Sequence, residues 1–212
     1  MLLDFFQTQD LNTLVISAVV MVIALMFHNV FQAWVASRYG DNGPRFSGYM
    51  SFDPQQQLEP IGVVFLFLLG FGWPRAIPTN SRNYRGRGRQ EAIVWYSGPL
   101  AYLIIAFLCY LVYLIFLRVG RQDLGIAFLT TGNIAILHAV INLFPVYPLD
   151  GAKAALAWGN ADVRRVVQQI ASYGFIGFIL IFLVLSFTGV LGGIIAFFRA
   201  IILIILGFIP GL

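Results

Sequence analysis

The sequence predicts an all-α polytopic membrane protein with about five transmembrane helices, a re-entrant segment and a short membrane-associated β-hairpin. Two features of composition support this class: 59% of the 212 residues are hydrophobic and only 10% are charged, whereas soluble domains carry about 25% charged residues. A third is a series of apolar segments, each near the length of about 20 residues that crosses a bilayer. These segments cover residues 13–37, 91–117, 124–146, 166–187 and 190–209.

The length fits one integral membrane domain over residues 1–212, without a separate soluble domain. The start, MLLDFFQTQDLN, contains Asp4 and Asp10 but no basic residue. It therefore lacks the features of a secretory signal, and we expect the first span to be retained. The single cysteine, Cys109, excludes an intrachain disulfide and a cysteine-based metal cluster.

The first span is expected to run from about Thr13 to Arg38, before a segment rich in glycine and proline. Its second half carries His28, Asn29 and Gln32 within an otherwise apolar run. Residues four apart share a helix face, so His28 and Gln32 point in the same direction. The pattern indicates polar chemistry below the membrane surface.

Two short elements are expected after the first span. Phe46, Gly48, Met50 and Phe52 alternate with serine and tyrosine, a period of two that predicts a strand or hairpin. The apolar run 61–73 has about 13 residues before a proline, which is short for a span and typical of a re-entrant segment.

The basic residues predict the orientation in the membrane. If 61–73 is re-entrant, one side carries ten basic residues and the other carries Arg118 and Arg121. The ten are Arg38, Arg45, Arg75, Arg82, Arg85, Arg87, Arg89, Lys153, Arg164 and Arg165. Basic residues mark the cytoplasmic side, which places the N-terminus outside and the arginine-rich loop 75–89 in the cytoplasm. Topology and contact with anionic headgroups thus explain the net charge of +4, and no nucleic acid partner is expected.

The later spans bring further polar groups into the membrane. The third span carries His138 and Asn142 and ends at PVYPLDG, where Asp150 follows two prolines. A break is expected at Gly159 between a short helix and the next span. Arg199 lies in the last apolar segment, where an arginine either snorkels to the interface or is functional.

Five blocks of the chain, in order, resemble motifs of the site-2 protease family of intramembrane zinc metalloproteases. They are HNVFQAW, QLEPIG, FGWPRAIPTNSRNYRGRGRQ, SGPLAYL and NLFPVYPLDG. The resemblance is closest to small bacterial members without a PDZ domain. It implies a protease-like core over 13–165, C-terminal transmembrane helices over 166–212, and location in a bacterial cytoplasmic membrane.

The resemblance also implies roles for single residues. His28 matches the first zinc histidine, Asp150 matches the aspartate ligand, and Asn142 matches an asparagine that assists near the scissile carbonyl. Two other positions depart from the motif H-E-x-x-H. Asn29 stands at the position of the general-base glutamate, and Gln32 stands at that of the second zinc histidine.

These departures weaken the expected chemistry. A catalytic zinc site has three strong protein ligands, and an amide is a poor one. Asn29 has no basic site at neutral pH, and loss of a general base removes about 10²- to 10⁴-fold of rate. Gln57 and Tyr102 also replace a histidine and an asparagine of the family pattern. We therefore expect no bound cofactor, with zinc present only in an active or relocated site.

Two questions about the site stay open at this point. His138 shares a helix face with Asn142, so His28, His138 and Asp150 could form a relocated metal triad; alternatively, His138 is hydrogen-bonded between helices. Asn29 and Gln32 are either natural substitutions or laboratory changes that trap an active enzyme.

Three functions compete on this basis. The first is an inactive homologue that binds a transmembrane client, with residues 46–52 adding as a strand to an extended client segment. The second is an active intramembrane metalloprotease. The third is a small transporter or channel with Asp150, His138 and Arg199 along a polar path. The expected partners are the lipid bilayer and a transmembrane client protein.

Overall fold

The chain is helical throughout most of the part that the structure describes. The computed structural model describes residues 10–209; residues 1–9, which include Asp4, and residues 210–212 lie outside that part. The helices are α2 (Leu11–Arg38), α3 (Gly43–Phe46), α4 (Pro54–Gln57), α5 (Pro60–Leu69), α6 (Gly88–Arg118), α7 (Gln122–Leu143), α8 (Asp150–Trp158), α9 (Ala161–Ser172), α10 (Gly174–Phe187) and α11 (Val190–Gly207), with a 3-10 turn at Ser81–Asn83.

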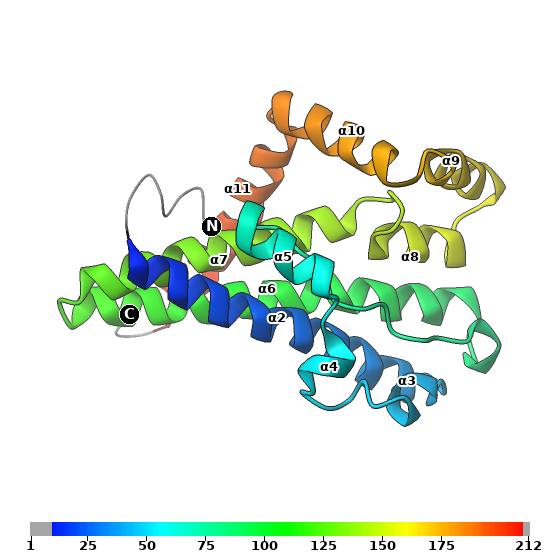
Figure 1. Cartoon of the computed structure of the whole chain (residues 1–212), viewed down its shortest axis with the longest axis horizontal. Helices are drawn as coiled ribbons and strands as arrows, with labels where there is room; N and C mark the ends of the chain where they lie inside the picture. Colours follow the sequence, from blue (N-terminus) through cyan, green and yellow to red (C-terminus); the bar gives the residue numbers. More distant parts are fainter. Residues whose placement is uncertain (1–9, 210–212) are drawn as a thin grey trace.

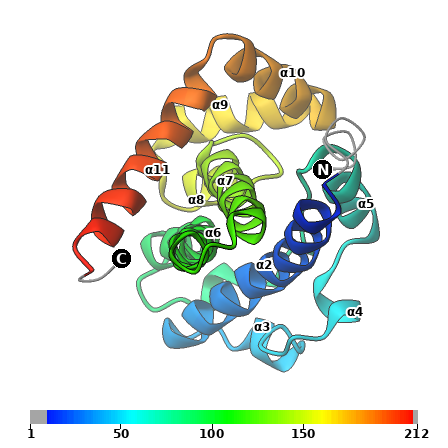
Figure 2. The same cartoon turned by 90° about the vertical axis from the view of Figure 1, so that its left-hand side faces the viewer.

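Helices α2, α6 and α7 lie side by side in the centre of the molecule (Figure 1). Helices α9, α10 and α11 form an arc on one side of them, and α3, α4 and α5 lie on the other side (Figure 2). Among the described residues, α2, α6, α7 and α11 are long and apolar enough to cross a membrane. Four of the five predicted spans are therefore confirmed, and the chain is an integral membrane protein.

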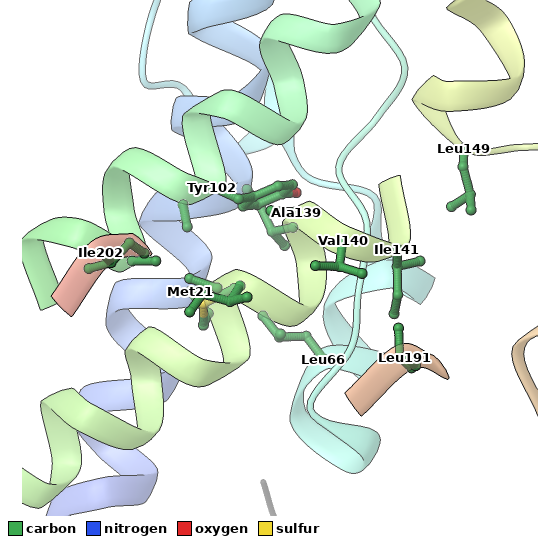
Figure 3. Packing of buried hydrophobic residues seen from close by; sticks show 14 of the residues in the cluster. Met21, Leu66, Tyr102, Ala139, Val140, Ile141, Leu149, Leu191 and Ile202 are labelled. Atoms are coloured by element: carbon green, nitrogen blue, oxygen red, sulfur yellow. The ribbon is translucent and has the colours of Figure 1, made fainter. Parts of the chain in front are cut away.

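Buried apolar side chains hold the three central helices together. Met21, Tyr102 and Ala139 come from α2, α6 and α7 and meet in the core (Figure 3). Small side chains at the contacts let the helix backbones approach closely, as is usual between helices in a bilayer. Fully buried examples are Ala24, Ala106, Ala135 and Ala139.

Hydrogen bonds between polar side chains also link the helices. The hydroxyls of Ser17 in α2 and Thr131 in α7 lie 2.8 Å apart. The Tyr110 hydroxyl of α6 donates to Asn133 Oδ1 of α7 at 2.7 Å. Such pairs give polar side chains the hydrogen-bond partners that hydrocarbon cannot supply. They also fix the register of α7 against both neighbouring helices.

The predicted span over 166–187 is divided by a bend, and its two helices together are long and apolar enough for one broken span or a re-entrant loop. The chain there forms two helices, α9 and α10, that are bent by 105° relative to each other. Arg164 and Arg165 are exposed on α9, and Gly174 between the helices has φ +59°, a conformation that favours glycine. The predicted break at Gly159 is confirmed, because α8 ends at Trp158.

The predicted β-hairpin over 46–52 is also wrong. Phe46 ends helix α3, and residues 47–50 form turns; within residues 10–209 there is no strand beyond one isolated bridge. The backbone bonds are local: Tyr49 N donates to Pro44 O at 3.0 Å, and Ser51 N donates to Gly48 O at 3.2 Å. Gly48 adopts φ +83°, which closes a turn where a strand would need an extended residue.

The segment around α5 makes an excursion and returns to its starting point. Leu58 and Pro74 form an antiparallel bridge, and Arg75 N donates to Gln57 O at 2.9 Å. Gly62 faces the returning segment so closely that a Cβ there would lie 2.1 Å from the Trp73 carbonyl oxygen. The two ends of this segment therefore lie side by side, and its re-entrant path in the membrane stays a prediction.

Candidate functional site

The polar residues of α2 meet the start of α8 in the interior of the molecule. His28, Asn29 and Gln32 follow one another along the second half of α2, and Asp150 is the first residue of α8. All four are buried, with exposures of 4%, 1%, 1% and 3%. The structure therefore brings together four of the residues that the sequence singled out.

The Asp150 carboxylate is the centre of this cluster. Its Oδ2 lies 2.7 Å from His28 Nε2 and accepts a second hydrogen bond from Gln32 Nε2 at 2.7 Å. Its Oδ1 lies 3.4 Å from the Lys153 ammonium. Burial alone would raise the pKa of Asp150, but His28 and Lys153 hold it below the ordinary value. The carboxylate is thus kept charged by three donors.

The backbone of α6 completes the cluster. Gln32 Nε2 also lies 3.1 Å from the carbonyl oxygen of Trp95. A Cβ on Gly98 would lie 2.3 Å from His28 Nε2, 2.4 Å from Gln32 Nε2 and 2.5 Å from Asp150 Oδ2. Only glycine therefore lets α6 pass this close to the three side chains.

Asn29 faces in the opposite direction from Gln32. Its Nδ2 donates to the Arg75 carbonyl oxygen at 2.7 Å, which leaves its Oδ1 facing His28 Nδ1 at 3.1 Å. An amide oxygen only accepts, so Nδ1 carries a proton. With Nε2 facing the Asp150 carboxylate, both nitrogens of His28 are occupied by hydrogen bonds.

His138 lies beside the cluster without joining it. Its Nε2 accepts a hydrogen bond from Gly72 N at 3.1 Å, and its Nδ1 donates to the Ile134 carbonyl oxygen at 2.8 Å. Tyr102 is fully buried, with its ring stacked on His28 at 4.8 Å and lying 5.3 Å from the His138 ring. His138 therefore has no free nitrogen to share with His28 and Asp150.

The remaining predicted site residues lie further out. Asn142 Nδ2 donates to the His138 carbonyl oxygen at 2.9 Å. Gln57 is buried and donates to the carbonyls of Tyr49 and Ser51 at 3.0 and 2.8 Å, so it anchors the turn over 47–51. The predicted client-binding residues Phe46, Gly48, Met50 and Phe52 belong to that turn or its flanks.

A cavity of about 330 Å³ opens onto the cluster. Polar residues form one wall, and aromatic residues of the re-entrant segment and α10 form the other. The polar wall contains His28, Asn29, Gln32, Asn142 and Asp150, and the aromatic wall contains Phe71, Trp73 and Phe178. None of the four predicted client-binding residues over 46–52 lines this cavity.

The donor set does not fit a catalytic zinc ion. Within residues 10–209, no three side chains of the types His, Cys, Asp or Glu lie close enough to hold a metal. Asn29 and Gln32 supply amides where the motif H-E-x-x-H has a carboxylate and an imidazole. An amide is a poor zinc ligand, which leaves His28 and Asp150 as the two strong donors of the cluster.

One side chain and two backbone features of this site were not predicted from the sequence. Lys153 has its ammonium 4.2 Å from the Trp95 ring centroid as well as beside Asp150. Its place three residues after Asp150 on a helix was the signal that could have identified it. The Trp95 carbonyl and the close approach of Gly98 leave no such signal in a sequence.

The close approach at Gly98 gives a test of the cluster. Gly98→Ala is expected to destabilise the protein by about 1–3 kcal/mol, because the methyl group forces His28, Gln32 and Asp150 apart. Thermal unfolding of the purified protein in detergent measures this as a lower midpoint. Gly193→Ala is the control, since a Cβ there meets nothing within 4 Å. Equal midpoints for the two variants would show that the cluster is not packed as described.

Comparison with known proteins identifies relatives but no solved structure. The chain is 28% identical over 189 residues to the Bacillus subtilis protein named "Putative zinc metalloprotease YwhC", covering 85% of each. It is 31% identical over 162 residues to Rip2 of Mycolicibacterium smegmatis, covering 73% of this chain and 61% of that one. Rip2 of Mycobacterium tuberculosis is 26% identical over 181 residues.

No family model and no solved structure matches the chain. The bacterial relatives carry names of zinc metalloproteases, and their alignments span most of this chain. The motifs from His28 to Asp150 resemble the same family. The chain is homologous to bacterial proteins that are named putative zinc metalloproteases, and its motifs resemble those of the site-2 protease family.

Proposed function

We propose that the chain is a proteolytically inactive site-2 protease homologue that binds a transmembrane client without cleaving it. One observation carries the proposal: Asp150 Oδ2 accepts hydrogen bonds from both His28 and Gln32 at 2.7 Å. The side chains at the family's metal-ligand positions are therefore hydrogen-bonded to one another here. The buried charge therefore has its partners within the protein.

The general-base position supports the same conclusion. Asn29 has an amide in place of a carboxylate, and that amide donates to the Arg75 carbonyl oxygen at 2.7 Å. It can neither take a proton from water nor move without leaving this carbonyl unpaired. Hydrolysis of a peptide bond needs an activated water, and the side chain at the general-base position cannot activate one.

The proposed client surface is the cavity beside the re-entrant segment. Residues 75–80 run there without helix or strand pairing, and Ala76 lines the cavity. Within residues 10–209 no hydrogen bond involves the Ala76 backbone. An extended client segment can pair with such a backbone by β-augmentation, while Phe71 and Phe178 contact its apolar side chains. Phe46, Gly48, Met50 and Phe52 stay predicted client contacts outside the cavity.

We further propose that the protein resides in a bacterial cytoplasmic membrane with its N-terminus outside and loop 75–89 in the cytoplasm. The charge asymmetry and the return of the chain from Leu58 to Pro74 support this orientation.

Single cysteines test the orientation in intact cells, since the native Cys109 is buried. Gln122→Cys is expected to react with a membrane-impermeant maleimide, because it follows the short loop on the outer side. Ser81→Cys is expected to react only after permeabilisation. The reverse pattern would invert the orientation.

Restoring the family motif tests the loss of the metal site. Asn29→Glu/Gln32→His is expected to bind about one zinc per chain, since it returns a third strong ligand beside His28 and Asp150. Elemental analysis of purified protein measures this, with Asn29→Gln/Gln32→Asn as an amide-preserving control. Stoichiometric zinc in that control would contradict the proposal, as would a restored variant that folds and still binds none.

Photo-cross-linking tests client binding without cleavage. A benzophenone amino acid at Ala76 is expected to capture a transmembrane client whose mass is that of the intact segment, because the cavity holds but does not hydrolyse it. The same probe at Gln122, on the far end of α6 and α7, is the control and should capture none. A captured fragment that ends at a new carboxyl terminus would show an active protease.

A further inference from the structure

A second and larger cavity lies at the polar end of α6. It has a volume of about 770 Å³ and is enclosed by the loop after the 3-10 turn, the first turns of α6, and α8. The loop contributes three arginines, α6 contributes Glu91 and Trp95, and α8 contributes Lys153 and Leu156. Lys153 lines both cavities and separates this one from the Asp150 cluster.

Positive charge dominates the wall of this second cavity. Arg82, Arg85 and Arg87 line it, and within residues 10–209 none of them forms an ion pair. Glu91 is the one carboxylate among the lining residues, and it forms no ion pair there either. Three guanidinium groups around a cavity of this size repel one another unless an anion lies between them.

The first turn of α6 adds to this positive field. The helix has 31 residues and no side-chain cap at its N-terminus. The backbone amides of Gly88 and Arg89 donate to no group in the described part of the chain. A Cβ on Gly88 would lie 2.0 Å from the Ala157 carbonyl oxygen, so this helix end is held tightly against α8. A helix N-terminus favours negative charge through its dipole and free amides.

The cavity lies at the level where a membrane helix leaves the hydrocarbon. The sequence of α6 is polar up to Glu91 and becomes apolar from Ala92 onward. Trp158, at the end of α8 beside the cavity, is 64% exposed. Exposed tryptophan at a helix end is typical of the headgroup region.

We propose that this second cavity binds a phosphate group, presented by the headgroup of an anionic phospholipid or by a soluble phosphate. Guanidinium groups bind phosphate oxygens through paired hydrogen bonds, and Arg82 and Arg85 can donate from the loop. A basic pocket between helices at the cytoplasmic surface is the type of site that holds anionic headgroups. The site is independent of the proposed client cavity and of proteolysis.

Lipid binding to the full chain in dodecyl maltoside micelles tests this proposal. Native mass spectrometry counts bound phosphatidylglycerol during a titration, with phosphatidylcholine as the uncharged comparison. Arg82→Gln/Arg85→Gln removes two cavity charges. Arg89→Gln/Arg164→Gln makes the same charge change at two arginines that are exposed, as Arg82 and Arg85 are, but do not line the cavity. Leu156→Trp fills the cavity and keeps every charge.

We expect one saturable phosphatidylglycerol per chain. Its affinity should fall about tenfold in the cavity double variant and in Leu156→Trp, and stay unchanged in the control double variant. If inorganic phosphate binds with the same dependence on the variants and phosphatidylglycerol does not bind, the ligand of this cavity is a soluble phosphate. Equal loss in both double variants, or no binding of either probe, would overturn the proposal. If Arg82→Gln/Arg85→Gln does not fold, the affinity of Leu156→Trp for phosphatidylglycerol tests the proposal instead.

Discussion

The interaction on which the site depends is the buried contact between His28 and Asp150. A carboxylate that is 3% exposed is costly unless donors surround it. His28 and Gln32 of α2 and Lys153 of α8 supply those donors. Because the partners come from different helices, satisfying one charge fixes α8 against α2. It also fixes α6, whose Gly98 must pass within reach of all three atoms.

The proposed loss of a metal site requires that the polar groups that remain inside the membrane have hydrogen-bond partners. Asn29 and Gln32 do so in opposite directions: one amide reaches the Arg75 carbonyl and the other reaches Asp150. Tyr102 fills the space between the two histidine rings, where the family pattern has a smaller asparagine. The amides at positions 29 and 32 thus form one hydrogen-bonded arrangement, and the Tyr102 ring packs beside it, which favours natural replacement over isolated laboratory changes.

Much of the fold could be predicted, because apolar length alone identifies a membrane span. The positions of His28, Gln32 and Asp150 could also be predicted, since helix periodicity and the motif order place them together. The β-hairpin could not: alternation over Phe46–Phe52 does not reveal that Gly48 turns the chain. The bend between α9 and α10 and the role of the Trp95 carbonyl depend on tertiary contacts and backbone atoms that side-chain patterns do not encode.

The central claim is that hydrogen bonds occupy the place of the zinc site. A crystal of the unmodified protein grown with zinc, measured on both sides of the zinc absorption edge, tests it most directly. We expect no anomalous peak at the cluster, with His28 Nε2 and Asp150 Oδ2 still at hydrogen-bond distance. A peak about 2 Å from both atoms would contradict it and would show that the chain keeps a metal centre with fewer protein ligands than the family pattern requires.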